Sequence, residues 1–211
     1  MQTHHSTTTR RRAFDRYMTR ADERKLFSYL RKFRCPWARR DLAWMTLARH
    51  TGLRVGTLIR LTEADARAAV AGADHNWLHV RAEIAKRGRA YDVPVNAAAK
   101  RALQTLLGLR RELGRNRYPD SPLIPSRQRG HVTARTLQNR MKMWCEAAGL
   151  DVTASPHWWR HTFAKRVMET STAADPRAVA GNLLGHCDLR STYQYTLPDR
   201  EDLQRAAKEA S

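Results

Sequence analysis

The sequence has few cysteines, few acidic residues and no long apolar run, and each shortage excludes a class of protein. Cys35, Cys145 and Cys187 lie far apart without a C-x-x-C pair, which argues against a disulfide framework and against a zinc knuckle. No apolar run approaches the roughly 18 residues of a membrane span, and the polar start MQTHHSTTTRRR lacks the apolar stretch of a secretory signal. We therefore expect a cytoplasmic protein with reduced cysteines and no membrane association.

The shortage of acidic residues leaves a large positive charge. The 39 Lys and Arg residues outnumber 20 Asp and Glu residues, which gives a formal net charge of +19 in 211 residues. Charged residues run along the whole length, and 42% of the residues are hydrophobic, which is typical of one globular domain rather than a disordered basic tail. Such a charge predicts a polyanionic partner.

Hydrophobic periodicity predicts a mainly α (α+β) fold. Apolar residues recur at helical spacing in segments that begin near residues 19, 36, 55, 103, 133, 156 and 175. WLHVRAEI and AYDVPV alternate apolar and polar residues around the tight basic AKRGR, which predicts a β-hairpin between Trp77 and Val95. We expect a helical domain over residues 16–198 with a small antiparallel sheet, a flexible basic arm over residues 1–15, and a C-terminal helix over residues 199–211.

Several boundaries of the predicted helices carry recognisable caps. Thr19 with Asp22 resembles a capping box, and Pro36 and Pro156 can each open a helix. Gly52 follows the second helix, where a glycine commonly ends one.

Six short motifs then occur in one order: TGLRVGTLIRL, the basic hairpin ending in VPV, SPLIPS, SPHWWRHTFA, LLGH and YQYT. Their order and spacing resemble the tyrosine recombinases, the phage integrase family, over about residues 19–196. The resemblance implies a mostly helical catalytic domain with a small sheet. Because the core-binding domain that most members carry does not precede these motifs, we expect a protein similar to the short, single-domain fimbrial phase-variation invertases.

The resemblance also implies an active site. Its members are two arginines, a lysine, two histidine-type positions and a tyrosine, which fall on Arg54, Lys86, His157, Arg160, His186 and Tyr195. The residue types suit phosphodiester cleavage, because forked and permanently charged guanidinium donors can bind the non-bridging oxygens of a phosphate. His157 and Arg160 are three residues apart at a helix start, so their side chains can meet one phosphate.

Each residue has a simpler interpretation when it is taken alone. In so basic a chain, Arg54 outside its TGLR motif would be a solvated residue or a contact to the DNA backbone. Lys86 shares its turn with Arg87 and Arg89, which we expect to bind DNA, and any of the three could serve only as a phosphate contact. Counting back from Val93-Pro94 in the family pattern selects Lys86, whose implied role is general acid to the leaving 5′-oxygen.

For the histidines and tryptophans, too, a structural role must be weighed against a functional one. A single histidine is more often a half-buried structural residue, but the motifs favour activation and phosphate contact for His157 and His186. Trp158 and Trp159 fit the core or an interface better than base stacking, because the bases of a duplex are not exposed for stacking.

The nucleophile must be chosen between two tyrosines, Tyr193 and Tyr195. The family places its tyrosine nine positions after the LGH histidine, which selects Tyr195, and Thr196 completes the family's YT pair. A free phenol has a pKa of about 10 and is a poor nucleophile at neutral pH, so the attack depends on the cationic pocket and a base.

Two positions depart from the family pattern. Thr57 stands three residues after the first arginine, where the family usually has an acidic residue that holds the active-site side chains, so we expect a looser or weaker site. Trp159 replaces the usual leucine before the second arginine, and neither change removes a reacting group.

The implied function is site-specific recombination of double-stranded DNA through a 3′-phosphotyrosyl intermediate. No metal or nucleotide cofactor is expected, because the phosphotyrosine conserves the bond energy. The resemblance implies homo-oligomers, with dimers on inverted half-sites and tetramers in synapsis, in a nucleoid-associated setting that admits accessory DNA-bending proteins. Two alternatives stay open: a type IB topoisomerase-like nicking and closing enzyme, and a catalytically silent DNA-binding regulator. The outcome (integration, excision, inversion or resolution) also stays open.

Overall fold

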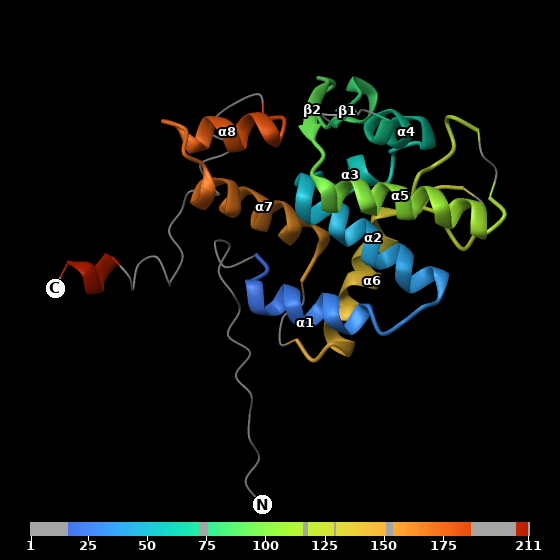
Figure 1. Ribbon diagram of the computed structural model, residues 1–211, viewed down its shortest axis with the longest axis horizontal. Coiled ribbons are helices and arrows are strands. Elements are labelled where there is room, and N and C mark those ends of the chain that lie inside the picture. Colours follow the sequence, from blue (N-terminus) through green and yellow to red (C-terminus); the bar gives the residue numbers. More distant parts are fainter. Residues whose placement is uncertain are drawn as a thin grey trace, which may run out of the picture.

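A computed structural model describes residues 17–71, 76–115, 118–128, 130–150, 154–186 and 206–210 (Figure 1). The predicted arm and most of the predicted C-terminal helix lie outside these residues. Two strands, β1 (Trp77–Val80) and β2 (Tyr91–Pro94), pair antiparallel. The labelled α-helices are α1 (Arg20–Leu30), α2 (Pro36–Thr51), α3 (Val55–Leu58), α4 (Glu63–Ala71), α5 (Ala97–Glu112), α6 (Ala134–Ala147), α7 (Pro156–Thr170) and α8 (Pro176–Leu183), and residues 206–209 are also helical. The predicted fold class is confirmed.

The predicted caps form as expected. The Thr19 hydroxyl accepts from the Asp22 backbone N–H at 3.1 Å, and the Asp22 carboxylate accepts from the Thr19 N–H at 3.3 Å, which completes the capping box of α1. Pro36 and Pro156 occupy the first turns of α2 and α7. The boundaries of these helices are therefore encoded locally.

The helix α4 was not predicted, and two predicted elements are shorter in the structure than expected. EADARAAVA offers only alanines and one valine as an apolar face, yet Thr62 and Asp65 exchange backbone-to-side-chain hydrogen bonds of 2.9 and 3.3 Å at the start of α4. The first strand ends at Val80 instead of Ile84, and a 3-10 turn, η2 (Ala82–Ile84), follows. The short helix that begins at Val55 was expected to run to Leu61, but it ends at Leu58.

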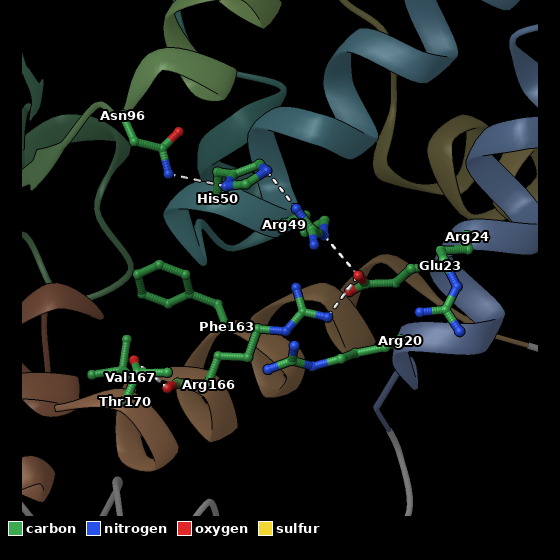
Figure 2. A pocket seen from close by; sticks show the side chains of 10 residues that line it. All are labelled: Arg20, Glu23, Arg24, Arg49, His50, Asn96, Phe163, Arg166, Val167 and Thr170. Carbon is green, nitrogen blue, oxygen red and sulfur yellow. Dashed lines mark hydrogen bonds and ion pairs between the residues drawn. The ribbon is translucent and has the colours of Figure 1, made fainter.

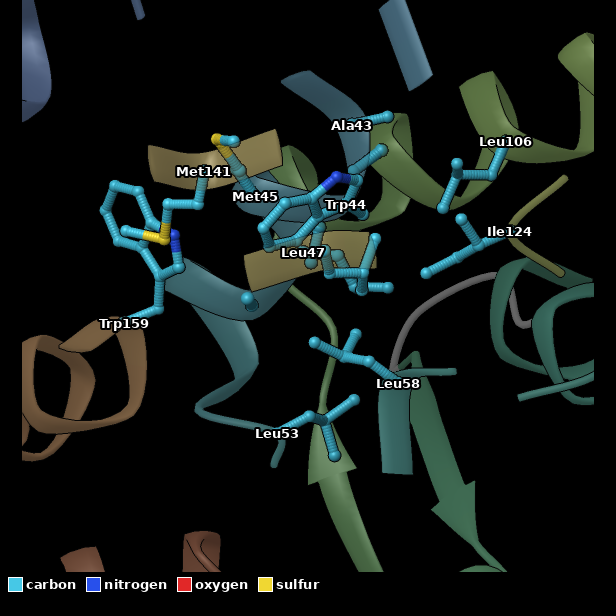
Figure 3. Packing of buried hydrophobic residues seen from close by; sticks show 14 of the residues in the cluster. Ala43, Trp44, Met45, Leu47, Leu53, Leu58, Leu106, Ile124, Met141 and Trp159 are labelled. Carbon is cyan, nitrogen blue, oxygen red and sulfur yellow. The ribbon is translucent and has the colours of Figure 1, made fainter. Parts of the chain in front are cut away.

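The core is built around α2, with α5 and α7 packed against it. Trp44 and Leu47 of α2 are fully buried, and Figure 3 shows them beside Leu106 of α5 and Ile124. Trp159 of α7 is also fully buried, and its ring stacks on Phe27 with centroids 5.3 Å apart and an interplanar angle of 8°. Trp158 is 8% exposed, so the prediction of core tryptophans is confirmed. Within the described ranges, no helix is both long and apolar enough to span a bilayer.

A buried carboxylate ties α2 to α6. Oδ1 of Asp41 accepts from Arg40 Nε at 3.0 Å and Nη2 at 2.7 Å, and from Trp44 Nε1 at 3.2 Å. Oδ2 accepts from Arg140 Nε at 2.6 Å and from Trp144 Nε1 at 2.8 Å. Asp41 is 0% exposed and Arg40 is 2% exposed, so the two charges depend on each other.

We predict that Asp41→Ala lowers the free energy of unfolding by about 3 kcal/mol or more, because it leaves the buried Arg40 guanidinium without its carboxylate. Urea unfolding followed by circular dichroism measures the change. Glu112→Ala is the matched control, since it removes a carboxylate from an exposed pair with Arg39 and should cost less than about 1 kcal/mol. Equal losses in the two variants would contradict the prediction.

Candidate active site

Arg160 is the centre of the polar cluster that the motifs form. Its side chain is fully buried in α7. Nη1 donates to the Gly52 carbonyl at 2.8 Å, and Nη2 donates to the Leu184 carbonyl at 2.9 Å. Nη2 also lies 2.8 Å from Nε2 of His186. One buried guanidinium therefore joins the TGLR, HWWR and LGH motifs, which are far apart in the chain.

His186 is neutral at physiological pH in this environment. Burial lowers its pKa to about 4, assisted by the positive charges of Arg160, Arg54 and Arg87. Because Arg160 donates to Nε2, the ring proton belongs on Nδ1. The ring can thus offer a neutral N–H donor beside the two arginines.

Two glycines allow this close approach. Gly52 has φ +63°, and a Cβ there would lie 2.5 Å from the Phe163 ring and 2.7 Å from Leu184. Gly185 has φ +62°, and a Cβ there would lie 2.7 Å from the ring of Tyr91. Any other residue would be strained and would push these neighbours away. The G of TGLR and the G of LGH are therefore needed for packing around Arg160.

Arg54 stands at the N-cap of α3, directly after the glycine turn that ends α2. It is half-buried, and its positive charge opposes the rise that burial causes in the pKa of Tyr91 and adds to the fall that burial causes in the pKa of His186. The structure therefore brings Arg54, Arg160 and His186 together, as the resemblance implied. Their chemical roles remain predictions.

Lys86 lies exposed on the hairpin turn together with Arg87 and Arg89. The backbone just before it is anchored to α3 and to the turn that follows α3, because the carbonyl of Ile84 accepts from the Thr57 hydroxyl at 3.3 Å and from Arg60 Nη2 at 3.0 Å. Thr57 thus has a structural partner of its own, although the sequence analysis treated it only as a lost carboxylate. Arg87 reaches the cluster electrostatically, since its charge acts on His186.

His157 is exposed in the first turn of α7, one turn before Arg160. Its ring contacts His161 edge to face, with centroids 4.7 Å apart. This places His157 at the rim of the cluster rather than in its buried centre. Tyr195 and the competing Tyr193 lie outside the described residues.

Sequence reasoning missed Tyr91 and Arg60. Tyr91 is the first residue of β2, and its phenol pKa is raised by burial while Arg160 and Arg54 oppose the rise. Arg60 holds the start of the hairpin turn. Only the position of Tyr91 beside the basic turn gave a signal, and that signal did not distinguish it from an ordinary strand tyrosine.

A second polar cluster clamps α1, α2 and α7 around a cavity of about 530 Å³ (Figure 2). Oε2 of the buried Glu23 accepts from Arg49 Nε at 2.8 Å and from Arg166 Nη2 at 2.6 Å. His50 lines the same cavity, with Nε2 2.5 Å from Arg49 Nη1 and Nδ1 3.0 Å from Asn96 Nδ2. Burial and the nearby arginines lower its pKa to about 4.

The low pKa values of His50 and His186 predict that the stability of the fold depends on pH. His50 and His186 each have a pKa of about 4 in the folded chain, whereas the ordinary pKa of 6.5 applies in the unfolded chain. The unfolded chain therefore binds protons more strongly at these two residues. The free energy of unfolding should therefore be constant above about pH 7 and should fall as the pH drops from 6.5 toward 4. Urea titrations between about pH 7.5 and 5 avoid most carboxylate titration. The variant His50→Gln should flatten the profile, and an unchanged slope in this variant would refute the role of His50.

A family comparison matches residues 16–201 to the model of the phage integrase family. Among curated relatives, the tyrosine recombinase XerC of Haemophilus ducreyi is 35% identical over 166 residues, which cover 79% of this chain and 50% of the relative. The chain XerC 1 of Ralstonia nicotianae is 34% identical and is covered over 54% of its length. The present chain thus spans about half the length of the curated relatives that it matches.

Solved structures share the fold. The XerA recombinase superposes with a TM-score of 0.71 at 22% identity, over 92% of this chain and 63% of XerA. XerH bound to its difH substrate before cleavage gives a TM-score of 0.69 at 20% identity, over 92% of this chain and 54% of XerH. A lambda integrase tetramer bound to a Holliday junction gives a TM-score of 0.62 at 22% identity, over 92% of this chain and 52% of the integrase chain. With its ordered motifs joined around Arg160, and with a family model that matches most of its length, the chain belongs to the phage integrase family.

Proposed function

We propose that this chain is the catalytic part of a site-specific DNA recombinase that cleaves and rejoins strands through a 3′-phosphotyrosyl intermediate. The observation that carries the proposal is the buried Arg160 guanidinium, which is held at the same point as Arg54 and His186. The XerC relatives, whose names describe them as tyrosine recombinases, support it.

The two arginines would bind the scissile phosphate. Phosphodiester cleavage concentrates negative charge on the non-bridging oxygens, and preorganised cationic donors stabilise that charge without moving during the reaction. Carbonyls on two sides fix the Arg160 fork, so little reorganisation is needed. His186 would add a neutral donor, and His157 would contact the same phosphate from the rim.

The chemistry requires a nucleophile and an acid. The oxygen of Tyr195, after giving its proton to a base at the site, would attack the phosphorus and form a phosphotyrosyl bond to the 3′ side of the break. The bond to the 5′-oxygen breaks in the same step, and Lys86 would supply the proton that this oxygen takes up. The 5′-hydroxyl of a partner strand then reverses the sequence, so bond energy is conserved and no external reactant is consumed.

The role of Lys86 has its own test. Lys86→Ala should slow cleavage of an ordinary phosphate by about 100-fold or more, because the leaving oxygen is no longer protonated. The loss should shrink greatly on DNA whose 5′-bridging oxygen is replaced by sulfur, which leaves without a proton. Arg89→Ala is the matched control. Because it removes only a phosphate contact in the same turn, it should slow cleavage equally on both substrates. Equal losses for Lys86→Ala would make it a phosphate contact too.

Double-stranded DNA is the proposed partner. The net charge of +19 supplies attraction to backbone phosphates, and XerH was solved bound to its difH substrate. Lambda integrase was solved as a tetramer on a Holliday junction, which supports dimers on inverted half-sites and a synaptic tetramer for this chain as well. In the same proposal residues 16–198 form the catalytic domain, residues 1–15 a basic arm, and residues 199–211 a helix that docks on a neighbouring subunit.

The test of the function is covalent capture from a pool of random-sequence duplexes that each carry one nick. A recombinase enriches duplexes that remain attached to protein in hot detergent, and sequencing the captured pool gives the target site. Two intact copies of that site on one plasmid should then yield exchanged strands. Plasmid relaxation without exchange would indicate the topoisomerase-like alternative, whereas detergent-sensitive binding alone would indicate the silent regulator.

A further inference from the structure

Tyr91 of β2 packs against the turn that carries His186. Two of its ring carbons lie 2.7 Å from the position that a Cβ would take at Gly185, in the turn that follows α8. Figure 1 shows β2 beside the end of α8. The hairpin that bears Lys86 and the turn that bears His186 therefore meet at this ring.

The Tyr91 hydroxyl lies inside the cluster rather than at its surface. It is buried, and no hydrogen bond of good geometry reaches it from the residues that the structure describes. Thr57 and Arg160 are its polar neighbours, and the charges of Arg160 and Arg54 act on it. Its raised pKa keeps the hydroxyl neutral, so it carries no charge into the cluster. Its effect must pass through the groups around it.

We infer that Tyr91 is a positioning residue of the active site: its ring holds the Gly185–His186 turn in register with Arg160. The inference rests on the proposed function. Arg160 donates to the Leu184 carbonyl and to His186, the residues on either side of Gly185. Loss of the ring leaves a void beside Gly185, so the carbonyl and the imidazole that fix the guanidinium can both move. Small displacements of this kind have large kinetic effects.

The test compares Tyr91→Ala and Tyr91→Phe in single-turnover cleavage of nicked DNA, with the dissociation constant of the same DNA measured in parallel. Tyr91→Ala should lower the cleavage rate constant by about 100-fold while the dissociation constant changes little. Tyr91→Phe keeps the ring and should stay within about 5-fold of the unmodified chain, because only a weakly bonded hydroxyl is lost. Val93→Ala, a buried residue of the same strand, is the control for lost packing and should lower stability without lowering the rate.

A second readout needs no DNA. In Tyr91→Ala, water reaches the His186 ring, so its pKa should rise from about 4 toward 6.5 in an NMR titration. Arg160 on α7, Arg54 at α3 and Arg87 on the hairpin remain and keep the rise incomplete. Val93→Ala should leave the titration unchanged. If Tyr91→Ala does not fold, Tyr91→Leu tests the same point, because it keeps bulk and loses the flat ring.

Two results would overturn the inference: unchanged cleavage by Tyr91→Ala, or a loss of rate matched by an equal loss of DNA affinity with His186 titrating as before. If the unmodified chain forms no covalent adduct, the proposed function fails. The His186 titration still decides whether Tyr91 holds the turn, so the two failures are distinguishable.

Discussion

Replacing Arg160 by lysine is expected to lower the rate of DNA cleavage by about two to three orders of magnitude, although the formal charge is unchanged. The guanidinium reaches the Gly52 carbonyl through one nitrogen and the Leu184 carbonyl and His186 through the other. A single ammonium cannot reproduce this fork, and an ammonium at a fully buried position tends to lose its proton. Single-turnover cleavage of nicked DNA measures the effect.

Arg39→Lys is the matched control for this prediction. It makes the same chemical change at an exposed arginine whose partner is Glu112. We expect a cleavage rate within about 2-fold of the unmodified chain, because exposed pairs contribute little. Near-normal cleavage by Arg160→Lys would show that the fork is not used and would contradict the proposed phosphate site.

Replacing Tyr195 by phenylalanine has the largest expected effect, the complete loss of covalent attachment to DNA. Only the attacking oxygen is removed, so the affinity for DNA should be retained. Gel shifts measure binding, and electrophoresis after heating in detergent measures attachment. Tyr193→Phe is the control within the same short segment and should leave attachment intact.

The opposite result for the two tyrosine variants would change the assignment of the nucleophile. If Tyr193→Phe abolished attachment while Tyr195→Phe retained it, the nine-residue spacing from His186 would have selected the wrong tyrosine. Loss of both attachment and binding in Tyr195→Phe would point to a role for its hydroxyl in DNA recognition instead.

Helix boundaries could be predicted from the sequence because their signals are local. The Thr19 capping box and the first-turn prolines act over a few residues and need no tertiary context. The helix α4 was missed although Thr62 and Asp65 cap it in the same way, because its apolar face consists mostly of alanines and gives a weak hydrophobic periodicity. The first strand ends at Val80, and the next residue, Arg81, pairs with Asp65 at 2.9 Å, a contact that no strand pattern reveals.

Motif order predicted which residues belong to the candidate site, whereas their mutual geometry could not be read from the sequence. Arg160 lies 108 positions from Gly52, and only the folded chain shows that their contact uses a carbonyl. The low pKa of His186 likewise depends on burial and on three arginines from separate segments. Thr57 stands where the family usually has an acidic residue, which suggested a weaker site. Its hydroxyl donates to the Ile84 carbonyl, just before the turn that carries Lys86, and the sequence does not reveal this contact.

The most direct test of the account is to map the covalent adduct. The full chain is incubated with nicked target DNA from the capture experiment, digested with protease, and the DNA-linked peptide is sequenced by mass spectrometry while the DNA end is identified chemically. We expect a peptide that contains Tyr195, joined through its phenolic oxygen to a 3′-phosphate, with a free 5′-hydroxyl on the released strand. Attachment through any other residue, attachment to a 5′-phosphate, or tight binding of target DNA without any adduct would contradict it.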